Sequence, residues 1–252
     1  MNEFFGPHWQ SILESNKLTS FDDFWSLTTP WFEEPNFRRG GWSGVTTVSI
    51  QNNKQQRTLF VKRQENHTTR TWSHPIKGIP TFKKEFQNLQ RFQQYGIPTL
   101  NLAFFGSRQQ GNGQQAIFVT EELTGYQPMD TAVRDLTQQQ RRHLLTAVAK
   151  VAYKMHLHHL QHNCFYPKHI FVKQQADTWS VKIIDLEKTK LTLTRQAATV
   201  RDLATLSRHS PKASFREQLY FLKVYFDEEK LSKTSKRLIK LIQRKINAKN
   251  HN

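Results

Sequence analysis

The chain changes its pattern near Leu123, and this change limits the fold more than any other feature of the sequence. Before this point, residues 44–62 predict a strand, a polar turn and a second strand rich in β-branched side chains. Residues 100–123 predict two more strands around a turn of Gly, Gln and Asn. One helix is expected between them, over residues 81–95. The first half of the chain is therefore expected to form an antiparallel sheet with one inserted helix.

The helix predicted over 81–95 carries its own start and stop signals. Thr81 is the expected N-cap, Glu85 follows in the first turns, and Gly96 is the expected stop. Apolar side chains recur along it at helical spacing, at Phe82, Phe86, Leu89 and Phe92.

After Leu123 the pattern is mostly helical. An amphipathic helix is expected after Thr137, two short strands near 170–174 and 179–186, and helices in the remaining residues. Strands with one inserted helix, followed mainly by helices, predict an α+β protein with two lobes. The apolar stripe of the long helix is expected at Leu144, Leu145, Val148, Val151, Ala152 and Met155.

This division gives three segments. Residues 1–37 are expected to be an N-terminal extension, residues 38–122 a first lobe, and residues 123–252 a second lobe that ends in a basic helix. The length of 252 residues and a hydrophobic content of 37% are enough for a sizeable core.

Charge points to the kind of partner. Lys and Arg number 37 against 20 Asp and Glu, a net charge of +17 that favours polyanions such as nucleic acid, an anionic membrane or a phosphorylated glycolipid. One cysteine excludes an intramolecular disulfide. No signal peptide and no apolar run of the roughly 18 residues that span a bilayer are evident, so a cytoplasmic protein is expected.

Two residues of the first half have the order expected of phosphoryl-transfer proteins. Lys62 ends an apolar strand, where a lysine binds nucleotide phosphates, although a strand-end lysine that reaches water would look the same. Glu85 lies on the helix that follows and is the expected ion-pair partner of Lys62. The alternative is a solvated glutamate beside Lys83 and Lys84.

Other segments of the first lobe are candidates for nucleotide contacts. Gly41 and Gly44, in the stretch RRGGWSGV (38–45), are expected to let backbone N–H groups approach phosphates, with a simple turn as the alternative. The backbone from Glu121 to Leu123 ends the last strand of this lobe and is expected to meet the edge of an adenine.

The stretches HNCFYPKHIFV (162–172) and VKIIDLEKTK (181–190) have the outline of a catalytic loop and a metal-binding strand end. Cys164 stands where such a loop carries an aspartate base. Asp185 closes an apolar strand, which is costly unless the carboxylate binds something, so it is a candidate Mg²⁺ ligand or, alternatively, a helix cap. Asp202, near the start of a helix, is expected to brace the loop or to interact with the helix dipole.

A zinc site is the competing interpretation of the histidine-rich region. His158 and His162 have i,i+4 spacing and Cys164 would be a third ligand. No paired C-x-x-C or H-E-x-x-H motif supports this alternative.

Together these stretches resemble the lipopolysaccharide kinase (Kdo/WaaP) family, and most of all its InaA-type branch. The resemblance rests on RRGGWSGV, LFVKRQENH, VTEELTGYQ, HNCFYPKHIFV and IIDLEK and covers roughly residues 38–208. It implies a bilobal protein-kinase-like fold with an antiparallel N-lobe sheet, one αC-type helix and a mainly helical C-lobe. It also implies ATP-dependent phosphorylation of an inner-core sugar of lipopolysaccharide, Kdo or heptose, with Mg²⁺.

The resemblance assigns roles to individual residues. Lys62 resembles the phosphate-binding lysine, Glu85 its partner and Asp185 the metal-binding aspartate. His162 resembles the first residue of the catalytic triplet H-R-D, and His169 falls where protein kinases keep an asparagine for a second metal. These residues are expected to meet in one cleft.

Cys164 departs from the family pattern, because the triplet here is His162, Asn163 and Cys164. A thiol has an unperturbed pKa near 8.5, so only a few per cent is thiolate at neutral pH. Loss of the base should cost about 10²- to 10⁴-fold in rate, unless His162, His169 or Glu187 substitutes. The chain is thus either an active kinase or a pseudokinase that acts as a scaffold or regulator.

The family resemblance also indicates partners. The lipopolysaccharide core or another anionic glycolipid, assembled at the cytoplasmic face of an inner membrane, suits the net charge of +17. Nucleic acid is not expected, because no nucleic-acid-binding module is recognisable. The basic C-terminal helix is expected either to lie on anionic lipid or to pack its apolar face on the core. That face would consist of Leu231, Leu238, Leu241, Ile242 and Ile246.

Overall fold

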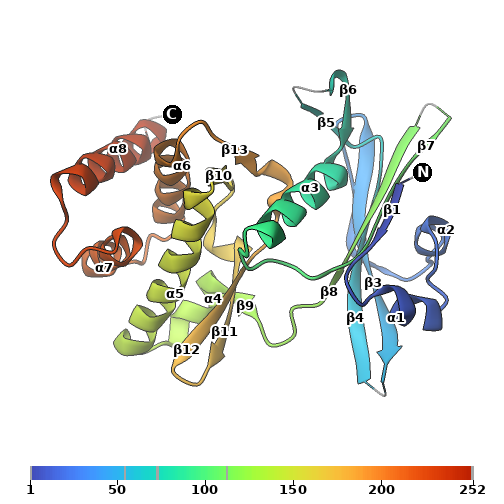
Figure 1. The fold of residues 1–252 in the computed structure, drawn as a ribbon, viewed down its shortest axis with the longest axis horizontal. Helices are drawn as coiled ribbons and strands as arrows, with labels where there is room; N and C mark the ends of the chain where they lie inside the picture. Colours follow the sequence, from blue (N-terminus) through green and yellow to red (C-terminus); the bar gives the residue numbers. More distant parts are fainter. Residues whose placement is uncertain (1, 54, 72–73, 112, 251–252) are drawn as a thin grey trace. The chain divides into compact units, whose positions relative to one another are not determined.

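The computed structural model describes residues 2–53, 55–71, 74–111 and 113–250 (Figure 1). The chain forms two compact units. The first consists of Met1–Gln87 and Leu100–Thr124, and the second of Asn88–Thr99 and Gly125–Asn252. The chain therefore passes into the second unit after Thr124, close to the division predicted after residue 122, but it also contributes the earlier segment Asn88–Thr99.

Hydrogen bonds explain why this earlier segment belongs to the second unit. The amide of Asn88 donates to the carbonyls of Leu186 and Thr189 at 2.8 and 3.0 Å, and the Thr99 hydroxyl donates to Ile183 O at 2.6 Å. All three contacts connect residues that lie about 80 or more positions apart, and sequence patterns do not reveal such pairs.

The first unit is built on a six-stranded sheet with the order β1-β7-β8-β4-β3-β2, in which every pair is antiparallel. The predicted hairpin over 44–62 and the predicted strand pair over 100–123 are both confirmed. A separate hairpin, β5–β6, precedes the helix. The strands of this unit are β1 (Asn2–Phe5), β2 (Trp31–Arg38), β3 (Gly41–Asn52), β4 (Gln55–Glu65), β5 (Thr68–Thr71), β6 (His74–Pro80), β7 (Leu102–Gln110) and β8 (Gly113–Glu121).

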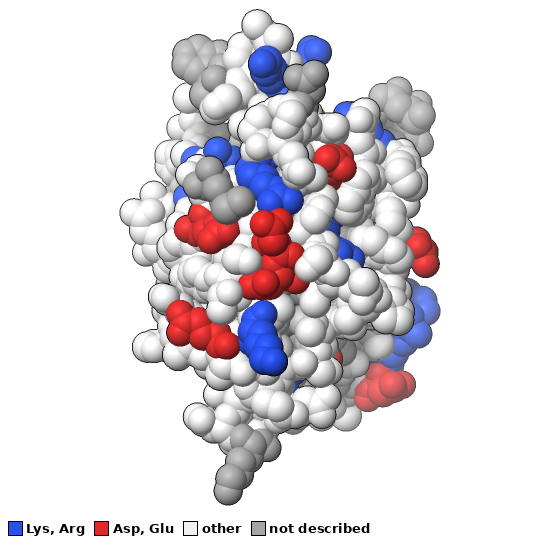
Figure 2. All heavy atoms as spheres, turned by 90° about the vertical axis from the view of Figure 1, so that its right-hand side faces the viewer, with Lys and Arg blue, Asp and Glu red and all other residues white. Residues whose placement is uncertain are grey.

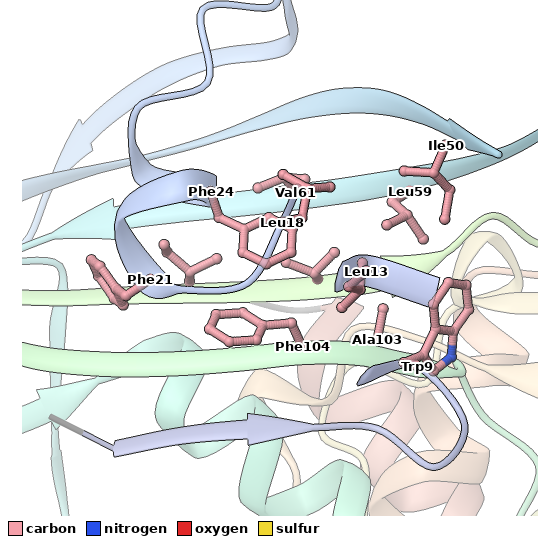
Figure 3. Packing of buried hydrophobic residues seen from close by; sticks show 12 residues of the cluster. Trp9, Leu13, Leu18, Phe21, Phe24, Ile50, Leu59, Val61, Ala103 and Phe104 are labelled. Atoms are coloured by element: carbon pink, nitrogen blue, oxygen red, sulfur yellow. The ribbon is translucent and has the colours of Figure 1, made fainter. Parts of the chain in front are cut away.

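Residues 1–37, predicted as an extension, are part of the first unit. They supply the edge strands β1 and β2 and two short helices, α1 (Gln10–Ser15) and α2 (Phe21–Trp25). Side chains of α1 and α2 pack on one face of the sheet, where Leu13, Phe21 and Phe24 meet β4 and β7 (Figure 3). Burial of these large apolar side chains stabilises the sheet by about 1.5–3 kcal/mol each.

Arg63 on β4 ties α2 to the sheet. Its guanidinium is buried and donates to the carbonyls of Trp25, the last residue of α2, and Leu27, at 2.7 and 2.8 Å. It also lies 4.6 Å from the centre of the Trp31 ring. Burial lowers the pKa of Arg63. A cation at the C-terminal end of a helix satisfies carbonyls that have no partner within the helix.

The predicted helix over 81–95 is α3 (Thr81–Gln94). Its first residue is Thr81, but the prediction of Thr81 as N-cap is wrong. The buried side chain of Gln64 accepts from the Phe82 amide at 2.9 Å and from the Thr81 hydroxyl at 2.7 Å, so a residue of β4 caps the helix. Gly96 has φ +60°, as expected for a glycine that ends a helix.

The second unit is mainly helical. The predicted long helix is α5, whose capping box joins Thr137 and Gln140, and the two short strands predicted after it form an antiparallel pair. Its helices are α4 (Met129–Ala132), α5 (Gln138–Leu157), α6 (Arg195–Arg208), α7 (Phe215–Phe226) and α8 (Lys233–Asn250), with 3-10 turns η1 (Val133–Asp135), η2 (Pro167–His169) and η3 (Leu186–Lys188). Its strands are β9 (Gln127–Pro128), β10 (Leu160–Gln161), β11 (Ile170–Gln175), β12 (Thr178–Ile183) and β13 (Lys190–Leu191).

The basic C-terminal helix α8 packs against α6, and Ile242 on its apolar face is 5% exposed. Of the two predicted alternatives, the structure therefore has the apolar face on the protein core. The basic side of the helix remains at the surface. No helix among the described residues combines the length and apolarity that a bilayer span requires.

Candidate functional site

Lys62 and Glu85 form an ion pair inside the first unit. Lys62 Nζ lies 2.9 and 3.2 Å from the two carboxylate oxygens of Glu85. The Glu85 side chain is 3% exposed and that of Lys62 is 24% exposed, so the carboxylate is buried while the ammonium group is partly accessible to solvent. The rings of Phe82 and Phe118 flank the ammonium group at 5.8 and 5.4 Å from their centres. The predicted ion pair is therefore present, and Glu85 is not a solvated glutamate; a role of Lys62 in phosphate binding stays a prediction.

Close packing explains why glycine occupies positions 41 and 44, near the β2–β3 turn. A Cβ at Gly41 would lie 2.0 Å from the Glu65 carbonyl oxygen, and one at Gly44 would lie 2.7 Å from the Trp31 ring. Arg39 and Gly40 have φ of +57° and +82°, which is the conformation of a tight hairpin turn. A role for Gly41 and Gly44 in nucleotide binding stays a prediction.

The end of β8 is tied to its neighbours by both backbone and side chain. The amides of Glu121 and Glu122 donate to Asn101 O and Thr58 O, at 3.0 and 2.9 Å. The Glu121 carboxylate accepts from Arg57 at 3.1 Å and from the side chain of Asn101. The N–H of Glu121 is therefore already used, and an adenine contact at this strand end would have to use carbonyl groups or the backbone of Leu123.

In the second unit, His162 holds the catalytic-loop segment to the end of β12. Its Nε2 lies 2.9 Å from Ile184 O, and its Nδ1 accepts from the Cys164 amide at 3.2 Å. Because a carbonyl oxygen only accepts and an amide N–H only donates, the proton of the neutral ring must be on Nε2. Both ring nitrogens are thus engaged and the side chain is buried, so His162 positions the loop and is not placed as a base.

Cys164 is 5% exposed. Burial raises the pKa of its thiol, and the nearby carboxylate of Asp185 raises it further, while Lys188 opposes both effects. The thiol therefore stays protonated at neutral pH and is a poor proton acceptor.

Asp185 adopts an unusual backbone conformation at the end of β12. Its φ and ψ are +60° and +62°, in the left-handed region that is costly for a residue other than glycine. Its side chain does not cap the η3 turn that follows, so the capping alternative fails. The carboxylate is 40% exposed and lies 3.4 Å from Nδ1 of His169.

His169 lies next to Asp185 and keeps the lone pair of one ring nitrogen. Its Nδ1 lies 2.9 Å from Cys164 O, which fixes the proton on Nδ1 and leaves the lone pair on Nε2. Burial lowers the pKa of His169, and the charge of Asp185 opposes this effect. A neutral imidazole next to a carboxylate can bind a divalent cation or accept a proton.

Asp202 lies in the middle of α6 and not near its start as predicted, but it braces the loop as predicted. Its carboxylate is fully buried and accepts from the His162 amide at 2.6 Å and from the Asn163 amide at 2.9 Å. His156 Nε2 lies 3.2 Å from the same carboxylate, and its Nδ1 lies 2.9 Å from the hydroxyl of Tyr225. The buried network from Tyr225 to the loop was not foreseen, since α7 carries no motif that marks it.

The zinc alternative is not supported. Among the described residues, no group of three or more His, Cys, Asp or Glu side chains is placed to hold a metal ion. Both ring nitrogens of His162 are engaged in hydrogen bonds, and His158 stacks on Tyr95 with ring centres 4.1 Å apart.

The sheet with its Lys–Glu pair and the helical unit with its braced loop and strand-end aspartate define a protein-kinase-like fold. The model of the lipopolysaccharide kinase (Kdo/WaaP) family matches residues 22–225, and the chain belongs to this family.

A relative and a solved structure agree with this assignment. The chain is 30% identical over 211 residues to "Protein InaA" of Escherichia coli (strain K12), which covers 81% of this chain and 95% of that protein. The structure is similar to that of WaaP in complex with acyl carrier protein, with a TM-score of 0.70 at 20% identity over 98% of this chain and 99% of the other. The resemblance to the family and the protein-kinase-like fold expected from the sequence are thereby confirmed.

Proposed function

We propose that this protein binds Mg·ATP and transfers its γ-phosphate to an inner-core sugar, Kdo or heptose, of lipopolysaccharide or a related glycolipid. The observation that carries the proposal is the Lys62–Glu85 pair, in which a buried carboxylate holds an ammonium group that keeps 24% exposure. An ammonium in this setting suits nucleotide phosphates. That Lys62 and Asp185 act on the same nucleotide stays a prediction.

Asp185 and His169 supply the groups for the divalent cation. The carboxylate is partly exposed and the neutral imidazole keeps the lone pair on Nε2, so both are suitable ligands. Mg²⁺ takes about six oxygen-rich ligands and usually keeps water and phosphate oxygens among them, so two protein groups are sufficient. Acceptor activation would then fall to His169 or Glu187, since the Cys164 thiol stays protonated.

A pseudokinase is the second candidate function, and Cys164 favours it. Burial keeps this thiol neutral in the position where catalysing relatives have an aspartate. A pseudokinase would keep the ion pair and nucleotide binding but transfer no phosphate, and it would act as a scaffold or regulator.

Contact with the membrane belongs to the same proposal. An acceptor glycolipid would be met at the cytoplasmic face of the inner membrane, where exposed basic side chains of α8 suit an anionic surface. Leu193 is 98% exposed and suits the same setting. The apolar face of α8 is packed on α6 and does not take part.

The first experiment measures nucleotide binding by thermal unfolding. Saturation to about 100 times Kd stabilises a protein by about 2.7 kcal/mol, or roughly 5–10 °C for a chain of this size. Mg·ATP should give such a shift in the wild type and little or none in Lys62→Met or Asp185→Asn. The matched controls are Lys77→Met and Asp177→Asn, which change exposed residues of the same types in the same units. An unchanged midpoint in the wild type would remove both candidate functions.

The second experiment separates kinase from pseudokinase. Transfer of labelled γ-phosphate to purified core glycolipid is expected for the wild type and for Asp177→Asn, and not for Asp185→Asn. Nucleotide binding without any transfer would favour the pseudokinase.

A further inference from the structure

A groove in the second unit lies beside the catalytic-loop segment and has no role in the functions discussed above. Its volume is about 850 Å³, within the range of small-molecule sites. It lies among β10, β13, α6 and α8, all of which belong to this unit. The described residues that line it are Gln161, Asn163, Lys190, Thr194, Gln196, Ala197, Val200, Arg201, Leu241, Arg244, Lys245 and Ala248.

The charge of the groove has one sign. Lys190, Arg201, Arg244 and Lys245 line it, and no acidic residue is among the described lining residues. In contrast, the face of the first unit that carries α1 and α2 shows acidic and basic side chains interspersed among neutral ones (Figure 2). Four cations around one hollow repel one another, and a bound anion would relieve that repulsion.

Arg201 is the least exposed of these four cations. Its Nε is buried and has no hydrogen-bond partner among the described residues, so a ligand in the groove does not reach this atom. The terminal nitrogens of a guanidinium group match the geometry of a carboxylate or phosphate, and through them Arg201 would bind an anion.

The candidate catalytic loop contributes to the lining of the groove. Gln161 and Asn163 flank His162, and Asn163 is the residue before Cys164. The Asn163 amide is held by Asp202, the neighbour of Arg201 on α6. On the same turn of α6, Asp202 holds the loop and Arg201 lines the groove. The helix that positions the loop would therefore also position a ligand in the groove.

The uncharged lining indicates the rest of the ligand. Ala197, Val200, Leu241 and Ala248 provide small apolar surfaces, while Thr194 and Gln196 provide hydrogen-bonding groups. A sugar ring has the same mixture of apolar C–H faces and hydroxyl groups. A flat bilayer surface cannot enter a groove lined in this way.

We propose that the groove binds the anionic part of the acceptor, a sugar that carries a carboxylate or a phosphate, next to the catalytic loop. This inference rests on the proposed function, because it names the acceptor-binding surface of that reaction. Arg201 and Arg244 contact the anion, and Gln196 faces the hydroxyl groups.

The test is a ligand-observed NMR titration with three probes: Kdo as a carboxylated sugar, glucose 6-phosphate as a phosphorylated sugar, and glucose as a neutral one. The protein should bind at least one anionic probe and not glucose, and the better probe identifies the anionic group. The variant Arg244→Gln/Lys245→Gln should weaken binding by roughly tenfold or more. The matched control is Lys236→Gln/Arg237→Gln, which removes the same charge from exposed residues of α8 outside the groove and should bind like wild type.

Three results would overturn the inference. These are equal weakening in both double variants, which would indicate a general charge effect, equal binding of glucose, and no binding of either anionic probe. Titration with vesicles of phosphatidylglycerol and phosphatidylcholine separates lipid from sugar, since a membrane surface should respond alike to both double variants. The thermal shift with Mg·ATP is read on the same samples. Anion binding without a nucleotide shift would refute the proposed function and leave the groove site, while a nucleotide shift without anion binding would refute the groove alone.

Discussion

The carboxylate of Asp202 determines how firmly the turn from His162 to Cys164 is held. It accepts two backbone hydrogen bonds in a fully buried position, at 2.6 and 2.9 Å. The change Asp202→Asn keeps one acceptor oxygen and places an NH₂ group against the other amide. One charge-assisted hydrogen bond is lost, which costs about 1.5–3 kcal/mol. That loss corresponds to an increase of about 10- to 150-fold in the equilibrium for opening of the loop.

The single cysteine of the chain makes this opening measurable. Cys164 lies at the end of the braced turn and is 5% exposed, so a disulfide reagent reaches it only when the loop opens. The labelling rate in native buffer is then proportional to the opening equilibrium. For Asp202→Asn we expect a rate about 10- to 150-fold above that of the wild type.

Asp177→Asn is the control, because it removes an exposed carboxylate of the same unit, in the turn between β11 and β12. It should label at the wild-type rate. Denaturant unfolding of each variant shows how much of the change is global. If Asp202→Asn labelled no faster than the wild type, the brace would not hold the loop, and the argument from its two hydrogen bonds would be wrong.

Three further predictions follow from the structure. Glu85→Gln removes the buried negative charge that faces Lys62. The free energy of unfolding should fall by an amount at the lower end of about 3–5 kcal/mol, because Lys62 is partly exposed. Urea unfolding measures this change, and an unaffected midpoint would contradict the prediction. Arg63→Met leaves two carbonyls at the end of α2 unpaired and should lower the free energy of unfolding by about 2 kcal/mol. Urea unfolding followed by tryptophan fluorescence measures this change, and a variant as stable as the wild type would show that Arg63 does not hold α2 to the sheet. Burial raises the folded-state pKa of Cys164, so the unfolded chain ionises first and the wild type should lose stability relative to Cys164→Ala as the pH rises above about 8.5. If the free energies of unfolding of these two proteins changed equally between neutral and alkaline pH, burial would not raise the pKa of the Cys164 thiol.

Local signals predicted the parts of the fold that lie close together in the sequence. The β3–β4 hairpin follows from β-branched residues on both sides of a polar turn, and α5 follows from its apolar stripe and the capping box at Thr137. The Lys62–Glu85 pair could also be predicted, because a strand and the next helix along the chain place the two side chains in one unit. In each case, the residues that determine the structure lie at most 23 positions apart in the chain.

The rest depends on contacts that local patterns do not carry. The helices α1 and α2 have only six and five residues, too few for a helical period to show, and their burial depends on the sheet face beneath them. Gln64 caps α3 from a strand, which no helix-start signal describes. The hydrogen bond between His156 and Tyr225 joins residues 69 positions apart. Packing of distant helices creates such pairs, so the sequence shows their members but not their partnership.

The loop around Cys164 also bears on where proton transfer would take place. Its backbone is held at both ends, by Asp202 at residues 162 and 163 and by His169 at the carbonyl of Cys164. The side chain of Cys164 is not needed for any of these contacts, and its thiol is kept neutral by burial. The same contact that fixes the carbonyl commits Nδ1 of His169, the ring nitrogen that lies 3.4 Å from Asp185, and leaves the lone pair on Nε2. Phosphoryl transfer relies mainly on positioning and charge neutralisation, and it asks little of a base. For the proposed transfer we therefore expect Asp185 and His169, and not Cys164, to carry the chemical role.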